Sequence, residues 1–127
     1  MLQRPLPRLT RTVSAVGLGT WQLGADWGDV SEADAIAVLS EAVEGGVTLL
    51  DTADVYGDGR SEQLIGSFLA ANPGHDLTVA TKMGRRQEQV AANYSPANFR
   101  AWVDRSRTNL GVDTLDLLIL HQPVPTH

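Results

Sequence analysis

The segment Val47-Thr-Leu-Leu-Asp51-Thr-Ala-Asp-Val-Tyr56-Gly57 joins a short apolar run to a polar loop. The centre of the run is apolar, as expected of a strand that is buried on both faces. Asp51 closes this predicted strand, and Tyr56 lies five residues further on, in the loop that follows. We therefore expect a carboxylate and a phenol at the carboxyl end of one buried strand.

The same kind of unit recurs on both sides of this segment. Apolar runs typical of strands cover residues 15–19, 77–81 and 115–120. Lys82 directly follows the run at 77–81, and His121 directly follows the run at 115–120. Three predicted strands thus end in a charged or titratable side chain.

Helical patterns separate these strands. Apolar residues recur at helical spacing after Ser31, Ser61 and Ser95, and serine is a preferred residue at a helix N-terminus. Glycines at 45, 46 and 111 are expected to end the first and third helices. The resulting order, β-α-β-α-β-α-β, predicts a parallel sheet with crossover helices. Residues 1–14 are expected to form a hairpin or an extended arm, and residues 122–127 show no regular pattern.

Composition excludes several classes of protein. The chain has 127 residues, a net charge of −5, mixed acidic and basic positions and no basic stripe, so we expect no nucleic-acid binding. No apolar run approaches the roughly 20 residues that a membrane-spanning helix needs. The chain has no cysteine, which excludes disulfides and thiolate chemistry and fits a cytoplasmic location. The three histidines lack metal-ligand spacing, and no metal site is expected.

The polar residues at the strand ends are expected to meet. The carboxyl ends of parallel strands lie at one edge of the sheet, where active sites of α/β proteins form. Tyrosine alone is a poor proton donor at neutral pH, but an ammonium beside it favours the phenolate. An aspartate would hold that ammonium, and a histidine could bond a substrate oxygen. Asp51, Tyr56, Lys82 and His121 would together suit proton transfer to or from a carbonyl.

Each of these residues also has a purely structural interpretation. An aspartate at a strand end is commonly a turn former, and a lysine there is commonly a solvated surface charge. Tyr56 precedes a glycine and could be a turn aromatic, and His121 could be a buried histidine with satisfied hydrogen bonds. Only their agreement on one edge favours the catalytic interpretation.

The glycines at 17 and 19 follow a predicted strand and invite comparison with a dinucleotide-binding fingerprint. Position 22 is Gln22 where that fingerprint needs a third glycine, and no helix is expected before Ser31. A tight turn before Trp21 is the better interpretation. Trp21 and Trp27 lie in this first loop, on the expected active edge, and are candidates for substrate contact.

Five ordered motifs resemble those of the aldo-keto reductase superfamily: Gly17-Leu-Gly-Thr-Trp21, Leu50-Asp-Thr-Ala-Asp-Val-Tyr-Gly57, Ser61-Glu-x-x-Ile-Gly66, Thr81-Lys82 and Leu118-x-Leu-His121. The resemblance covers nearly all of residues 10–125. It implies a (β/α)₈ barrel of the TIM-barrel class that reduces aldehydes and ketones with NADPH. This chain would supply the first β-α-β-α-β-α-β half of that barrel.

The resemblance also implies roles for individual residues. Tyr56 matches the general acid, Lys82 and Asp51 match its assisting ion pair, and His121 matches the residue that orients the carbonyl. The positions near the nicotinamide and its ribose correspond to Gly19, Thr20 and Asp51. The substrate would meet Trp21 and, from its place in the first loop, Trp27, together with Tyr56 and His121.

A (β/α)₈ barrel needs upwards of about 200 residues, roughly twice the length of this chain. The family's phosphate-binding groups belong to the second half of the barrel. We therefore expect two alternatives: an NADPH-dependent carbonyl reductase, or a truncated, non-catalytic half-barrel that binds cofactor only after assembly with another chain. The unpaired first and fourth strands of a half-barrel predict self-association through their edges.

Overall fold

The computed structural model describes residues 1–24 and 30–121 of the chain. Its main sheet has four parallel strands in the order β3-β4-β5-β6. Their bounds are β3 (Leu18–Gly19), β4 (Leu49–Asp51), β5 (Thr78–Met83) and β6 (Leu117–Leu120). The connecting helices are α1 (Glu32–Glu44), α2 (Arg60–Ala71) and α3 (Pro96–Leu110). The predicted βα alternation and parallel sheet are confirmed, and the tail predicted at 122–127 lies outside the described residues.

The core forms between the sheet and its helices. Leu50 and Val79, from the two central strands, lie with Leu39 of α1 and Ile65 of α2 in one buried cluster. Leu50, Leu39 and Ile65 are completely buried. Since side chains alternate along a strand, Asp51 and Lys82 belong to the faces of β4 and β5 that point away from this cluster.

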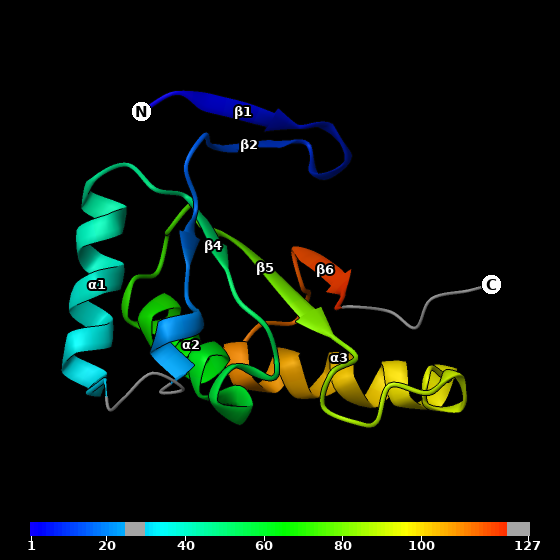
Figure 1. Ribbon diagram of the computed structural model, residues 1–127. Helices are drawn as coiled ribbons and strands as arrows, with labels where there is room; N and C mark the ends of the chain where they lie inside the picture. Colours follow the sequence, from blue (N-terminus) through cyan, green and yellow to red (C-terminus); the bar gives the residue numbers. More distant parts are fainter. Residues whose placement is uncertain (25–29, 122–127) are drawn as a thin grey trace.

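An N-terminal hairpin lies at the end of the sheet where the parallel strands begin. It consists of β1 (Gln3–Leu6) and β2 (Arg11–Ser14), joined by the 3₁₀ turn η1 (Pro7–Leu9). Arg11 donates a 3.1 Å hydrogen bond to the Thr78 hydroxyl and pairs with Asp116 at 3.4 Å, both at the starts of strands. In Figure 1 the arrowheads of β4 and β5 point away from the hairpin. The hairpin therefore leaves the carboxyl ends of the strands uncovered.

The helix ends are mostly those that the sequence predicts. Ser31 and Ser95 accept hydrogen bonds from the backbone three residues on, and Gly111 adopts the left-handed conformation after α3 (φ 67°). The prediction for α2 is wrong. Its N-cap is Gly59, also left-handed (φ 100°), and Ser61 lies inside the first turn. The Ser61 hydroxyl is turned to neighbouring loops and does not cap its own helix.

The strands are shorter or shifted relative to their predicted bounds. β3 contains only residues 18 and 19, although the apolar run begins at Ala15, and Val16 is 58% exposed. Among the described residues β3 is an edge strand that pairs with β4 alone, and β4 is itself three residues long, so only two residue pairs form. β5 continues to Met83, because β6 pairs with it there.

Candidate active site

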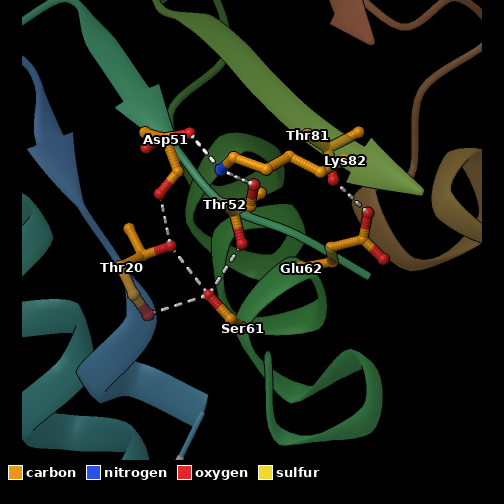
Figure 2. Close-up of polar contacts among 7 residues, drawn as sticks. All are labelled: Thr20, Asp51, Thr52, Ser61, Glu62, Thr81 and Lys82. Carbon is orange, nitrogen blue, oxygen red and sulfur yellow. Dashed lines mark hydrogen bonds and ion pairs between the residues drawn. The ribbon is translucent and has the colours of Figure 1, made fainter. Parts of the chain in front are cut away.

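Asp51 and Lys82 form the centre of the site. The Lys82 ammonium donates a 2.6 Å hydrogen bond to Asp51 Oδ1 and a 2.8 Å hydrogen bond to the Thr52 carbonyl oxygen. The Lys82 side chain is 14% exposed, whereas that of Asp51 is 49% exposed. The ion pair is thus anchored in the protein on the lysine side and open to solvent on the carboxylate side. Figure 2 shows both contacts of the ammonium.

Tyr56 reaches the same place from the loop after β4. It begins the 3₁₀ turn η3 (Tyr56–Gly59), and its ring centroid lies 5.4 Å from the Lys82 ammonium. The turn packs against η2 (Trp21–Gly24): a Cβ on Gly24 would lie 2.6 Å from the Gly57 nitrogen. Only glycine permits this approach of the two loops, and the approach helps to hold the Tyr56 phenol near the ammonium.

His121 completes the group at the end of β6. Its ring stands perpendicular to that of Tyr56, with 6.3 Å between the centroids, and its backbone N–H donates to the Met83 carbonyl at 2.8 Å. Burial, followed by the charges of Lys82 and Arg85, lowers the pKa of His121 below its usual 6.5. Its surroundings therefore favour the neutral form of the His121 ring.

The structure brings the four residues Asp51, Tyr56, Lys82 and His121 together, and the other candidates lie around them. Gly19 is exposed and has open space beside its Cα, whereas Thr20 is completely buried and its hydroxyl donates to the Asp51 carbonyl at 2.9 Å. Trp21 starts η2 and is 42% exposed. Trp27 lies outside the described residues.

Three buried hydroxyl groups lie behind the ion pair. The Ser61 hydroxyl lies 2.8 Å from Thr20 Oγ1 and 2.9 Å from Thr52 Oγ1, and all three residues are completely buried. Figure 2 shows Ser61 of α2 between the loop after β3 and the loop after β4. This cluster ties α2 to the backbone that holds Asp51 and Thr52.

The next residue of α2, Glu62, makes a similar hydrogen-bonded contact to β5. Glu62 is completely buried, and its Oε2 accepts a 2.7 Å hydrogen bond from the hydroxyl of Thr81, the residue before Lys82. Glu62 Oε1 accepts from the Asn109 amide at 3.1 Å. A buried carboxylate needs such donors, because an unpaired charge is costly in the protein interior.

Asp54 lies between Asp51 and Tyr56 in the chain and is completely buried. Both of its carboxylate oxygens lack a hydrogen-bond partner. Burial, and then the negative charge of Glu62, raises the pKa of Asp54 from 3.8 to about 6. Arg105 approaches only the Asp54 backbone, to whose carbonyl it donates at 3.2 Å.

Reasoning from sequence did not single out Thr52, Asp54 or Glu62, and it assigned Ser61 to a helix cap. One signal was available for Ser61 and Glu62. Both fall on the helical stripe that continues through Ile65, Phe68 and Leu69, all buried. Polar residues on an apolar stripe are expected to have specific partners. Thr52 accepts from Lys82 through its backbone carbonyl, and no sequence pattern predicts such a backbone contact.

Residues 1–24 and 30–121 offer neither a metal centre nor a membrane-spanning helix. Within these ranges no three His, Asp or Glu side chains are grouped so that they could hold a metal ion. No helix in the same ranges has the length and apolar character needed to cross a bilayer.

Comparison with known proteins places the chain in a family. The sequence model of the aldo/keto reductase family matches residues 15–127. The chain belongs to this family. Its members are oxidoreductases, and the described sheet and helices form part of the family's barrel fold.

Individual members of the aldo/keto reductase family show the extent of the similarity. L-galactose dehydrogenase of Arabidopsis thaliana is 40% identical over 111 residues, which are 86% of this chain and 34% of the relative. NADH-specific methylglyoxal reductase of Escherichia coli is 35% identical, over 98% of this chain and 43% of the relative. An aldo-keto reductase of Klebsiella pneumoniae, solved in complex with NADPH, superposes with a TM-score of 0.74 at 25% identity, over 92% of this chain and 38% of that one. The chain thus spans about two fifths of the length of its relatives.

Proposed function

We propose that the chain carries the proton-transfer machinery of a carbonyl reductase that uses a nicotinamide cofactor. The observation that supports this most directly is the position of the Lys82 ammonium. It lies 2.6 Å from Asp51 Oδ1 and 5.4 Å from the centroid of the Tyr56 ring. An ammonium held in this way favours the phenolate and makes the phenol a usable proton donor.

Tyr56 is the general acid in this proposal. It donates its phenolic proton to the oxygen of an aldehyde or ketone as that oxygen gains negative charge. Lys82 stabilises the phenolate that remains, and Asp51 keeps Lys82 charged and in place. The lowered pKa of His121 favours the neutral form of the ring, which argues against that ring as the acid. Its neutral ring has one N–H, which can orient the carbonyl oxygen.

A bound nicotinamide would supply the hydride to the carbonyl carbon. On the described surface, Gly19 and Asp51 fit the edge of such a group, since one offers open space and the other an exposed carboxylate. The Thr20 side chain is buried, so any contact from this position would come from its backbone. NADPH is the preferred donor in our proposal, and Trp21 and Trp27 remain proposed substrate contacts. A cytoplasmic location also remains a prediction.

The proposal predicts that the chain binds NADPH and reduces a simple aldehyde, and that Tyr56→Phe lowers the rate at least about 100-fold, the usual contribution of a general acid. The measurements are NADPH fluorescence during titration and NADPH absorbance during turnover. Tyr94→Phe is the matched control. Tyr94 is the only other tyrosine in the sequence, and its buried hydroxyl has no partner.

If the 127-residue chain binds no NADPH at millimolar concentration, it is not by itself a reductase. Equal losses in Tyr56→Phe and Tyr94→Phe would instead assign the effect to folding. NADH titrated in the same way would separate the two nicotinamide cofactors.

A non-catalytic half-barrel is the second candidate, and one observation favours it. β6 is an edge strand in the described part of the chain, and its last three residues, Leu118, Ile119 and Leu120, are 37%, 44% and 36% exposed. An apolar strand edge of this kind is a template for pairing with another chain. Light scattering after size-exclusion chromatography tests this, because a monomer at all concentrations would contradict self-association.

A further inference from the structure

The hydrogen bonds of the hydroxyl cluster behind the active site follow one consistent order of donor and acceptor residues. Thr20 Oγ1 donates its proton to the Asp51 carbonyl at 2.9 Å. It must therefore accept at the 2.8 Å contact with Ser61, which donates there or to the Thr20 carbonyl at 3.1 Å. Ser61 has then used its proton, so Thr52 donates at the 2.9 Å contact between Thr52 Oγ1 and Ser61 Oγ. The chain of donors runs from Thr52 through Ser61 and Thr20 to Asp51.

Both ends of this chain of donors lie at the ion pair. Thr52 begins it with its hydroxyl, and the Thr52 carbonyl accepts from the Lys82 ammonium at 2.8 Å. Asp51 ends it with its carbonyl, and the Asp51 carboxylate accepts from the same ammonium at 2.6 Å. The two groups that accept from Lys82 therefore belong to Asp51 and Thr52. Thr20 bonds to the first of these residues and Ser61 to the second (Figure 2).

We propose that Ser61 is a positioning residue of the active site: through Thr52 and Thr20 it fixes the two acceptors that hold the Lys82 ammonium beside Tyr56. Ser61 does not touch the reacting atoms. It lies in the first turn of α2 and does not cap that helix, so its hydroxyl bonds to other elements and not to its own helix. Without that hydroxyl, the buried Thr52 donor loses its acceptor, and a buried unsatisfied group is costly enough to move the backbone.

The test follows Lys82, which is the only lysine in the sequence and gives a single side-chain signal. The full chain is labelled with ¹³C,¹⁵N-lysine, and the exchange of the Lys82 Nζ protons with water is measured by NMR. Acetylation of Lys82 by limiting acetic anhydride, relative to the N-terminal amine, gives a second readout by mass spectrometry. Both rates should rise about three- to tenfold in Ser61→Ala, as expected from loss of one hydrogen bond of ordinary strength.

Ser106→Ala is the matched control. Ser106 is also a completely buried helical serine, but its hydroxyl has no partner and its helix is α3. Its substitution should leave both Lys82 rates unchanged. Circular dichroism melts show whether each variant is folded.

A second pair of variants decides the matter if Ser61→Ala does not fold. Thr52→Val keeps the shape and removes the donor, and should accelerate both rates, whereas Thr52→Ser keeps the donor and should restore them. If Lys82 in folded Ser61→Ala and in Thr52→Val exchanges and reacts as in the parent chain, Ser61 does not position it.

The catalytic meaning of this positioning rests on the proposed function, but the test uses neither cofactor nor carbonyl substrate. An inactive chain with a Ser61-dependent Lys82 would overturn the proposed function alone. An active chain with unchanged Lys82 rates in the variants would overturn only the role of Ser61.

Discussion

The ends of β5 and β6 carry the same kind of sequence but are held in different ways. Each is an apolar run with a titratable residue at its carboxyl end. Around Lys82, Thr81 bonds to the buried Glu62, and the ammonium has two acceptors. Around His121, the preceding Leu118 to Leu120 are exposed, and Nδ1 has no hydrogen-bond partner. A central strand is fixed from both sides, while an edge strand relies on one neighbour.

This difference divides the candidate site into two parts. Asp51 and Lys82 are preorganised by the core, because α2 packs behind them and bonds to the loop after β4 and to β5. His121 is oriented by its backbone bond to Met83 and by contact with Tyr56. The Asp51–Lys82 ion pair should therefore tolerate loss of the edge strand's contacts better than His121 does.

The largest expected effect contrasts the central strand with the edge strand in stability. Leu50→Ala removes a completely buried side chain and should lower the free energy of unfolding by about 2–5 kcal/mol. Leu118→Ala removes a side chain that is 37% exposed and should cost less than about 1 kcal/mol. Urea unfolding followed by circular dichroism measures both. Equal losses would mean that β6 is covered in solution.

A smaller effect concerns Asp54, which lies in the loop after the central strand β4 and whose carboxylate has no hydrogen-bond partner. Because its pKa is about 6 in the folded chain and 3.8 is its ordinary value, the folded state retains a proton that the unfolded state releases. Stability should therefore fall by on the order of 2 kcal/mol as the pH rises from about 4 to above 6. Glu62, Asp58, Arg86 and Arg105 are the charged groups that act on it.

Asp54→Asn cannot titrate and should flatten this part of the pH profile of unfolding. Asp113→Asn is the control, since Asp113 is exposed. An unchanged profile in Asp54→Asn would show that Asp54 is ionised or partnered in solution.

The smallest expected effect concerns His121, which directly follows the edge strand β6. The pKa of His121 is lowered by burial first and by the charges of Lys82 and Arg85 next, while Asp51 opposes them. Lys82→Met removes one positive charge and should raise the pKa of His121, without cancelling the effect of burial. NMR titration of the histidine ring protons, assigned with His121→Gln, measures the shift. A pKa that stays constant would mean that His121 does not lie near Lys82 in solution.

The gathering of the four catalytic candidates could be predicted because it depends on rules that sequence patterns report. Parallel strands have a common carboxyl edge, and the residue after each apolar run therefore lies there. The role of Ser61 could not be predicted in this way. A serine before a helical pattern is typical of a cap, and only the packing of α2 against two loops turns its hydroxyl towards Thr20 and Thr52.

The sequence by itself determined the family, the parallel βα order and the residues at the strand ends, since periodicity and short motifs are local properties. Only the tertiary structure decided which of these residues have hydrogen-bond partners and which groups those partners are. The Lys82 ammonium donates hydrogen bonds to the Asp51 carboxylate and to the Thr52 carbonyl. The carboxylate of Asp54 is buried without a hydrogen-bond partner. The physical reason is that hydrogen bonding and desolvation depend on neighbours that are distant in the chain: Lys82 is 31 positions from Asp51 and 30 from Thr52.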